Sequence, residues 1–580
     1  MASISINTND IKSLEDAKLA LQNHATDKSS IDFIDIIIFL RKKMVIEASW
    51  SFKSWVQNYK LPQDHYFVLL PVIAQLDAEN ELRPFLQETR SEIVNAVFEK
   101  REITDIPAFI SNLGFTKANS KEKLLVLADE IVSHFIIKAY DSNLIELALH
   151  LENIYYAEFI TKFETDDMFK YGMKKIVESA EKAGQRIDKI LNPAGTNEFS
   201  DYNNRIPRVG IFFHNASMLA HIDNVFNFLK TLTDRKRLQF TPIIICLGGR
   251  NKEFANAFSS IGIEVLYLDS DDTGAPIDNL YHRLLRLREV CTKKQIDKLA
   301  WGCLSTFMVF VFSMKVAPEH IWWSQKWTGL SSNAIDKYIY SLTPILEQKL
   351  NGNRWLGGWF QRKNWLEQND IIEEVNAVRS DFGDCIILGS LARTDKMSNE
   401  RYLAAVVDIL KSKDKVVYVW TGRDKDPFIE KFFIDNGVVE KTKFVGWVNT
   451  SVYAHVIDVL LDTFPTGNGV TALQAMEAGT PIITMKSIGD VRTWDQFIGP
   501  ALDEGSFHYK KLAKLFRDSE SDENLYLCAS DINEYISMAN QLIQNKDKQK
   551  KVGKAGAEFV KIMMKNPSES ADIFQKHILS

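Results

Sequence analysis

Cysteine is scarce in this sequence, and its few copies are scattered. The 580 residues contain an odd number of cysteines and no CxxC pair; the five are Cys246, Cys291, Cys303, Cys385 and Cys528. Disulfide frameworks and zinc-binding modules need cysteines paired at defined spacing, so neither is expected. The pattern is typical of a reducing compartment, and we expect a cytoplasmic location.

Long apolar runs and an excess of positive charge are missing as well. The longest apolar runs, Ile36–Leu40 and Phe307–Phe312, are much shorter than the roughly 20 residues of a membrane-spanning helix. The residues after Met1 do not form the basic and then apolar pattern of a signal peptide. A formal net charge of −6 argues against general nucleic-acid binding. We therefore expect a soluble protein that binds no nucleic acid.

Glycine is absent before Gly114, and this part of the chain has the pattern of helices. Apolar residues recur at three- and four-residue spacing, as in Lys121–Ala139 and Leu144–Phe163. Trp50 and Trp55 are expected to be core residues, because aromatic side chains commonly pack inside. The sequence predicts an all-α domain over residues 1–195, without a 34-residue repeat, that binds an acceptor or a protein partner.

Strands and helices alternate after a loop-like segment that begins near Asn192. The first alternating segment has expected strands at 208–214, 240–247 and 264–268. The second begins at Asp384 and has expected strands at 385–389, 416–421, 443–444, 456–461 and 482–485. Alternation of this kind predicts two Rossmann-like α/β domains with parallel sheets, over 205–375 and 380–540, and helices over 541–580. The active site is expected in the cleft between the two domains.

One stretch of the second domain, Leu460–Met485, has the composition of an anion-binding turn. An apolar strand leads into Asp462, a glycine-rich turn follows, and a helix is expected over Val470–Ala478. The amino end of that helix presents free N–H groups and a positive dipole end. Glycine lets the backbone approach a ligand closely, so the turn suits a phosphate or pyrophosphate.

Polar and basic residues on two loops of this domain are candidate donor ligands. Arg393 and Lys396 follow an expected strand and would neutralise a diphosphate, with an ordinary basic loop as the alternative. Gln474 lies one helical turn beyond the glycine-rich turn and is the candidate for the ribose hydroxyls. The other predicted contacts at the turn are Asn468, Gly469, Val470 and Thr471.

The run Thr466–Thr484 resembles the nucleotide-sugar signature of GT-B glycosyltransferases. The large retaining group of that fold carries a glutamate at each end of the turn, where this chain has Thr466 and Gln474. The resemblance implies an α/β GT-B fold that binds a nucleoside diphosphate sugar, and the two substitutions favour an inverting enzyme.

A second resemblance is to glycosyltransferase family 41, which includes O-GlcNAc transferases and bacterial asparagine N-glucosyltransferases. It is carried by Ala317–Gly329, by Ile335–Tyr338 and by the run Leu461–Pro465 into Gly-Asn. The strand end Phe212–His214, followed by Ser217 and His221, is similar to the bacterial members, as is Lys396 after its strand. The resemblance places Gln325 and Lys326 in a donor-contacting loop. The helical domain without repeats also fits the bacterial branch.

The resemblance implies a metal-independent displacement from a UDP-sugar such as UDP-glucose or UDP-GlcNAc, without a cofactor. Arg393, Lys396 and the dipole of the Val470 helix would stabilise the leaving diphosphate. Histidine suits proton transfer near neutrality, so His214 and His221 are the candidate bases, with a structural role as the alternative for each. Trp447 is a candidate to stack on uracil or to pack its own loop. The acidic pairs Asp269/Asp271 and Asp424/Asp426 are interpreted as loop acids.

The acceptor is open at this stage. The first hypothesis is transfer to an Asn, Ser or Thr side chain of a protein. The alternatives are transfer to a polysaccharide or a lipid-linked glycan, and a non-catalytic GT-B partner of another transferase. In the glycan alternative, the basic segment Lys546–Lys554 would make peripheral membrane contact, whereas a solvated helix face is the simpler interpretation. The sequence does not predict an oligomeric state.

Overall fold

The structure is a computed structural model of the chain. It describes residues 36, 45–58, 76–100, 106–108, 110–111, 121–160, 166–193, 205–217, 220–302, 307–324, 330–340, 347–350, 352–357, 368–487, 493–502, 513–563 and 567–580. The chain forms two compact units. One comprises residues 1–217, 240–337 and 350–353, and the other comprises 218–239, 338–349 and 354–580.

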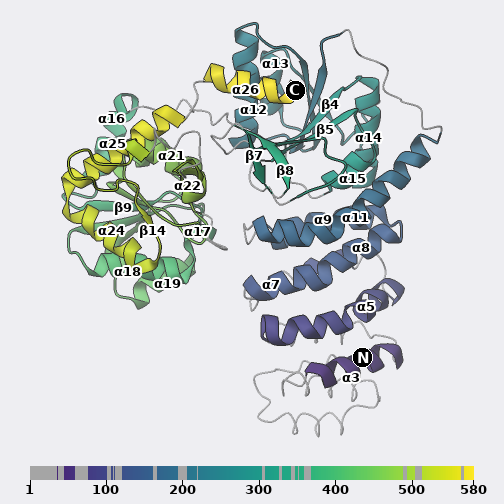
Figure 1. Cartoon of the computed structure of the whole chain (residues 1–580), viewed down its shortest axis with the longest axis horizontal. Coiled ribbons are helices and arrows are strands. Elements are labelled where there is room, and N and C mark those ends of the chain that lie inside the picture. The colour runs from purple at the N-terminus through teal and green to yellow at the C-terminus, as the bar shows by residue number, and fades with distance from the viewer. Residues whose placement is uncertain are drawn as a thin grey trace. The chain divides into compact units, whose positions relative to one another are not determined.

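The amino-terminal region is a stack of helices (Figure 1). Its elements are α3 (Val45–Asn58), η1 (Ala78–Leu82), α5 (Arg83–Lys100), α7 (Lys121–Leu127), η2 (Ala128–Val132), α8 (Ser133–Asp141), α9 (Ile145–Ile154), η3 (Tyr155–Ile160) and α11 (Asp166–Leu191). Phe52 of α3 meets Phe85 of α5 edge to face, at 5.8 Å between ring centroids. Trp50 is 66% exposed, so its prediction as a core residue is wrong: it lies on the face of α3 opposite the buried Phe52 contact. The side chain of Trp55 is outside the described residues.

Polar contacts hold the helical stack against the first α/β region. The Glu146 carboxylate of α9 accepts hydrogen bonds from the backbone N–H groups of Leu280 and Tyr281, at 3.1 and 2.7 Å, and so caps the helix that begins there. A side chain at Gly184 of α11 would place its Cβ 2.4 Å from the carbonyl oxygen of Phe310, so the backbones pack in direct contact. The helical region is therefore built into the same unit as most of the first sheet.

The first sheet has eight strands in the order β3-β2-β1-β4-β5-β6-β8-β7. Their bounds are β1 Arg208–Asn215, β2 Thr241–Gly248, β3 Glu264–Tyr267, β4 Lys298–Trp301, β5 Glu319–Ser324, β6 Lys337–Tyr340, β7 Glu347–Leu350 and β8 Asn353–Leu356. The pairs among β1 to β5 are parallel. The helices between them are α12 (Ala220–Asp234), α13 (Lys252–Ser260), α14 (Leu280–Lys293) and α15 (Met308–Ser313). The predicted parallel sheet is confirmed, and β4 to β8 extend it beyond the three strands that were expected.

The second sheet has six parallel strands in the order β11-β10-β9-β12-β13-β14. The strands are β9 Ile386–Ser390, β10 Val416–Trp420, β11 Thr442–Phe444, β12 Val459–Leu461, β13 Ile482–Met485 and β14 Cys528–Ala529. The helices are α16 (Gln368–Ser380), α17 (Thr394–Met397), α18 (Glu400–Lys411), α19 (Pro427–Asp435), α20 (Thr450–Val456), α21 (Val470–Glu477), α22 (Asp495–Leu502), α24 (Ile532–Gln544) and α25 (Lys546–Met563), with η4 at Val439–Lys441. The strand order reverses between β9 and β12, which makes the carboxyl ends of these two strands the expected ligand position.

The carboxyl-terminal helices have two different packing partners. Helix α25 lies against α21, and a Cβ at Gly553 would come within 1.9 Å of the carbonyl oxygen of Gly479. Helix α26 (Pro567–Leu579) packs on α12, where Phe228 and Phe574 stack at 5.0 Å. The last helix therefore contacts a helix that lies more than 300 residues earlier in the chain, and Gln575 also accepts the N–H of Gln239, which follows that earlier helix.

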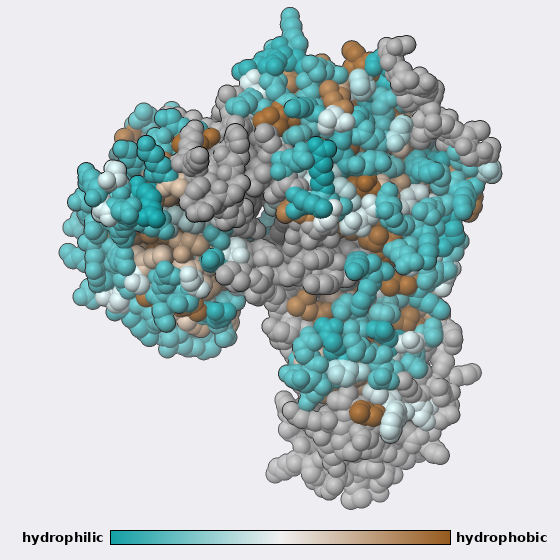
Figure 2. Space-filling view, in the orientation of Figure 1, coloured by the Kyte–Doolittle hydropathy of each residue, from teal (hydrophilic) through white to brown (hydrophobic). Residues whose placement is uncertain are grey.

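The described surface is mainly hydrophilic on the face in Figure 2, with small separate apolar spots. No described helix is long and apolar enough to cross a bilayer. The basic segment 546–554 forms the start of α25. Two of its lysines pair with carboxylates: Lys548 with Glu523, and Lys551 with Asp518 at 2.7 Å.

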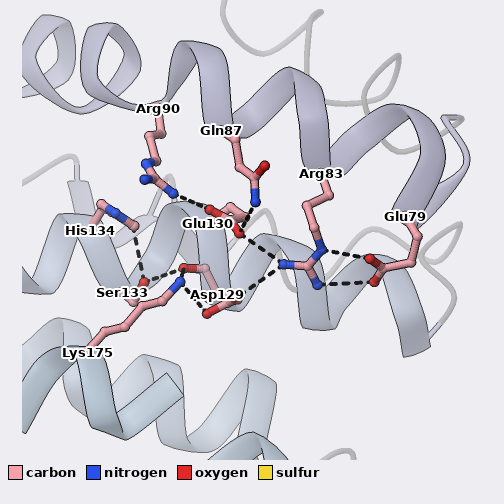
Figure 3. Close-up of polar contacts among 9 residues, drawn as sticks. All are labelled: Glu79, Arg83, Gln87, Arg90, Asp129, Glu130, Ser133, His134 and Lys175. Carbon is pink, nitrogen blue, oxygen red and sulfur yellow. Dashed lines mark hydrogen bonds and ion pairs between the residues drawn. The ribbon is translucent and has the colours of Figure 1, made fainter. Parts of the chain in front are cut away.

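An ion-pair network centred on a buried carboxylate joins four elements of the helical stack, η1, α5, η2 and α11 (Figure 3). Glu130 of η2 is 2% exposed, and its carboxylate accepts hydrogen bonds from Arg83 at 3.0 Å, from Gln87 at 3.1 Å and from Arg90. Arg83 also pairs with Glu79 and Asp129, at 2.7 and 3.0 Å. The network thus ties α5 to η2.

The same network continues to α11 through a lysine. Lys175 lies 2.6 Å from Asp129, and the hydrogen bonds of Lys175 and Arg83 lower the pKa of Asp129 although burial acts to raise it. Burial, together with the charges of Arg90 and Lys175, lowers the pKa of the neighbouring His134 to about 4, so this ring is neutral at pH 7. Three cations therefore face three carboxylates, and the network balances its own charge.

Candidate functional site

The predicted donor loops lie at the switch point of the second sheet. The loop with Arg393 and Lys396 follows β9, and the glycine-rich turn follows β12, the neighbouring strand. Lys396 donates a hydrogen bond to the carbonyl oxygen of Gly467 at 2.7 Å. The structure therefore brings together the two loops that the sequence predicted to act jointly.

The carboxylate of Asp462 holds the glycine-rich turn through hydrogen bonds. Its side chain is fully buried and accepts three hydrogen bonds: one oxygen from the Asn468 N–H at 2.6 Å, and the other from the Trp494 N–H at 2.7 Å and the Thr484 hydroxyl at 2.8 Å. Burial raises the pKa of Asp462 to about 6, although these hydrogen bonds and the charge of Lys396 act to lower it. The backbone carbonyl of Asp462 also accepts the Tyr535 hydroxyl at 2.9 Å.

The two glycines of the turn differ in the space around them. A Cβ at Gly467 would lie 2.5 Å from the Cα of Thr493 and 2.8 Å from a carboxylate oxygen of Asp462, so glycine is required there. A Cβ at Gly469 would meet nothing within 4 Å. Gly469 is the N-cap of α21, and no side chain caps that helix. The open side of the turn is therefore at Gly469 and the first amides of α21.

Asn468 is the polar residue at this turn that lacks a partner. It is 3% exposed, and its side-chain nitrogen Nδ2 has no hydrogen-bond partner among the described residues. A buried amide nitrogen without an acceptor is costly, by about 1–3 kcal/mol. An oxygen of a bound ligand would remove that cost.

Two of the other predicted contacts are engaged inside the protein. The Thr471 hydroxyl donates to the carbonyl of Leu391 at 2.8 Å, which ties α21 to the loop after β9. Its single proton is therefore in use in this structure. Gln474 is 9% exposed, and its Nε2 lies 3.4 Å from the Ser451 hydroxyl of α20. Donor contact by either side chain stays a prediction.

The neighbouring strand ends complete this edge of the second sheet. Gly422 follows β10, and its N–H donates to the carbonyl of Gly446 at 3.2 Å, so the loops after β10 and β11 touch. A Cβ at Gly422 would lie 2.5 Å from the Thr394 side chain, which places the start of α17 against this loop. Trp447 is 80% exposed and so does not pack into the protein, which leaves its indole accessible for stacking. Arg393 is exposed at the N-cap of α17.

The predicted bases lie on β1 and α12. His214 is near the carboxyl end of β1, and burial, followed by the charge of Arg283, lowers its pKa. A neutral imidazole at pH 7 is able to accept a proton. His221 lies in the first turn of α12, and its side chain is outside the described residues. Gln325 and Lys326 also lie outside the described residues.

Three acids of the two acidic pairs, Asp269, Asp271 and Asp426, make contacts within the protein. Asp269 pairs with Arg250 at 3.1 Å, and Asp271 accepts the Thr273 hydroxyl at 2.7 Å within a turn. Asp426 is the N-cap of α19 and accepts the Phe428 N–H at 2.9 Å. In the part of the chain that the structure describes, no group of three His, Cys, Asp or Glu side chains is placed to hold a metal ion.

Sequence reasoning missed Asp462 and the buried hydroxyls beneath it. Ser390 at the end of β9 bonds to Tyr402 and, at 2.8 Å, to the carbonyl of Leu461, while Tyr402 lies 3.1 Å from Tyr418. These bonds fix the ends of β9 and β12 relative to each other. The signal was present for Asp462, because a carboxylate that directly follows a fully apolar strand is buried at a strand end.

No known protein-family profile matches the chain, and no curated protein matches it in sequence. Its structure is similar to a mutant of Thermobaculum terrenum O-GlcNAc transferase, with a TM-score of 0.50 and 13% identity over 95% of this chain and 98% of that one. A glycosyltransferase from Rickettsia africae has a TM-score of 0.44 and 13% identity, over 65% of this chain and 100% of that one. An Anabaena protein in complex with UDP and glucose has a TM-score of 0.42 and 9% identity, over 64% and 98%. The first likeness confirms the predicted fold: the chain has the GT-B fold preceded by a helical region.

Proposed function

We propose that this chain is a glycosyltransferase that takes its sugar from a UDP-sugar. The observation that carries the proposal is the buried, unpartnered amide of Asn468 at the switch point, next to the Lys396 contact with Gly467 and the uncapped start of α21. The similar O-GlcNAc transferase, which aligns with 95% of this chain, supports the choice of a sugar-nucleotide donor.

The residues of the second sheet would act mainly on the leaving group. Asn468 would donate its free N–H to a diphosphate or sugar oxygen, and Arg393 would add a second cation from the exposed end of the same loop. Negative charge develops on the diphosphate as the bond to the sugar breaks. Lys396 and the dipole of α21 would stabilise that charge, with a contribution that grows toward the transition state. Trp447 would stack on the base, and Gly469 and Val470 would let the backbone approach the diphosphate.

The finer parts of the proposal concern the acceptor and the mechanism. We propose an inverting, metal-independent transfer to a protein side chain. Thr466 and Gln474 stand where retaining GT-B enzymes resembling this chain carry glutamates. His214 would be the base, because its lowered pKa keeps it neutral at pH 7, and His221 is the second candidate. The helical region would help to hold the polypeptide acceptor.

Lys396→Met tests the donor role directly. Wild-type protein is titrated with UDP-glucose and with UDP-GlcNAc by calorimetry, and sugar transfer is followed by mass spectrometry of co-expressed proteins. The variant should lose about 100-fold or more in kcat/KM, because one stabilising charge at a developing anion is typically worth that much. Lys431→Met, an exposed lysine of α19 paired with Asp435, is the matched control and should leave kcat/KM unchanged.

Three outcomes would contradict the proposal. A wild-type protein that binds neither UDP-sugar would exclude the donor assignment and favour a non-catalytic partner. Sugar found on glycans but not on proteins would exclude the protein acceptor. Loss of activity in EDTA, restored by a divalent cation, would exclude the metal-independent mechanism.

A further inference from the structure

The strongest feature that the proposed chemistry does not use is the buried carboxylate beneath the turn. Asp462 is fully buried and its carboxylate lies beside Gly467, whereas a Cβ at Gly469 would meet nothing within 4 Å. It therefore has no part as a donor ligand. Its hydrogen bonds reach two loops, the turn itself and the segment that begins at Thr493.

We propose that Asp462 is a positioning residue that presents the Asn468 amide to the donor, by accepting two backbone N–H groups as an ionised carboxylate. This inference rests on the proposed function. One oxygen holds the Asn468 N–H and the other holds the Trp494 N–H. Thr493 in turn lies against Gly467, so the two bonds together fix the backbone on both sides of the turn.

An ionised carboxylate suits this arrangement. The two backbone N–H groups approach different oxygens, and neither can reverse its role to become an acceptor. An asparagine in place of Asp462 would direct its own NH₂ group at one of them. Protonation of the carboxylate weakens both hydrogen bonds, because a neutral carboxyl oxygen is a poorer acceptor than an ionised one. Either change would weaken the hold on the turn.

The charges around Asp462 determine how it responds to pH. The groups among the described residues that act on it are Lys396 of α17, by its charge, and Tyr535 of α24, which bonds its backbone carbonyl. Burial raises the pKa of Tyr535 well above its ordinary value near 10, so this side chain stays neutral between pH 5 and 8. Asp462, with its pKa raised to about 6, does change in that range.

Donor affinity should therefore fall as the pH decreases. If only the ionised form of Asp462 holds Asn468 in place, the apparent Kd is the intrinsic Kd divided by the ionised fraction, so binding should be about tenfold weaker at pH 5 than at pH 8. The probe is UDP-glucose, with UDP-GlcNAc in parallel. UDP alone is unsuitable, because a terminal phosphate itself titrates near pH 6.

The decisive variant is Asp462→Asn, measured by calorimetry from pH 5 to 8 with thermal unfolding at each pH. It should bind the UDP-sugar about tenfold more weakly than wild type at pH 8, the cost of about one hydrogen bond, and its affinity should no longer depend on pH. Thr484→Val removes one bond that lowers the pKa of Asp462, so the midpoint should move to higher pH while the affinity at pH 8 is kept.

Asp458→Asn is the matched control on the same segment. Asp458 accepts the Ile387 N–H at 2.7 Å and pairs with Arg379 at 2.9 Å at the opposite end of β12. This variant should lower stability without changing donor affinity or its pH dependence. Unchanged affinity and pH profile in Asp462→Asn would overturn the inference and leave the proposed function intact. A folded wild-type protein that binds neither UDP-sugar would overturn both.

Discussion

The helical stack and the glycine-rich turn after β12 each bury one carboxylate. The groups that surround these two carboxylates differ. Glu130 receives a guanidinium from each side and an amide, within a network of three cations and three anions (Figure 3). Asp462 receives two backbone N–H groups and a hydroxyl, and the Asn468 amide above it has no partner among the described residues.

On this difference we base the proposal that the turn binds a ligand, whereas the helical network has a structural role. A network whose charges and hydrogen bonds are satisfied internally gains nothing from a ligand, and breaking it leaves buried charge unpaired. A cluster that orients one unsatisfied group gains a hydrogen bond when a ligand arrives. Buried polar residues occur at both places, so burial alone would not have distinguished the two sites.

The largest expected effect is on stability and comes from Glu130→Ala. The substitution leaves Arg90 and Gln87 without their acceptor and removes one partner of Arg83. We expect a loss of about 3 kcal/mol in the free energy of unfolding, the lower end of the range for a broken buried pair, because Arg83 and Arg90 are partly exposed. Urea unfolding followed by circular dichroism measures it.

A control and a second readout sharpen this prediction. Glu79→Ala removes an exposed partner of the same Arg83 and should cost less than about 1 kcal/mol. UDP-glucose affinity should be the same in both variants and wild type. A weaker donor affinity in Glu130→Ala at a pH and temperature where it is folded would show that the network is not purely structural.

The next largest effect is on donor binding and separates the two glycines of the turn. Gly467→Ala forces a Cβ against Thr493 and Asp462, so the turn must move, and a displacement of about 1 Å can cost about 100-fold. A Cβ at Gly469 would meet no atom within 4 Å, so Gly469→Ala creates no side-chain clash. Its free energy of unfolding should stay within about 0.5 kcal/mol of wild type.

Calorimetry with UDP-glucose, together with urea unfolding, distinguishes these cases. Weaker binding by the stable Gly469→Ala variant would indicate that the donor touches the backbone there. Full affinity in Gly467→Ala would contradict the need for glycine at that position and, with it, the fixed geometry of the turn.

The smallest expected effect is a shift in a pH profile and concerns the first sheet. Burial is the larger cause of the lowered pKa of His214, and the charge of Arg283 is the second. Arg283→Met should therefore raise that pKa. A base must be neutral to act, so the acid limb of kcat/KM against pH should move to higher pH. Arg286→Met, on the same helix and paired with Asp272, is the control. An acid limb that does not move would remove His214 from the base role.

Periodic patterns account for the parts of the fold that the sequence predicted well. The apolar runs at 208–214, 416–421 and 482–485 became β1, β10 and β13, because a strand buried on both faces needs a continuous apolar run. The glycine-rich turn was recognisable because glycines followed by the start of a helix form a pattern within a few residues of the sequence. The prediction that Trp50 is a core residue was wrong because the sequence around an aromatic residue does not indicate which face of its helix will be covered.

Local sequence patterns were sufficient to predict the α/β alternation, the helical first region and the two loops that carry Arg393, Lys396 and Asn468. The contacts of each side chain in those loops became known only from the folded chain. Thr471 and Gln474 are bonded inward, Lys396 reaches Gly467, and Asn468 keeps a free amide above Asp462. The reason is physical: secondary structure follows from neighbours along the chain, whereas hydrogen-bond partners come from strands and helices that only folding brings together.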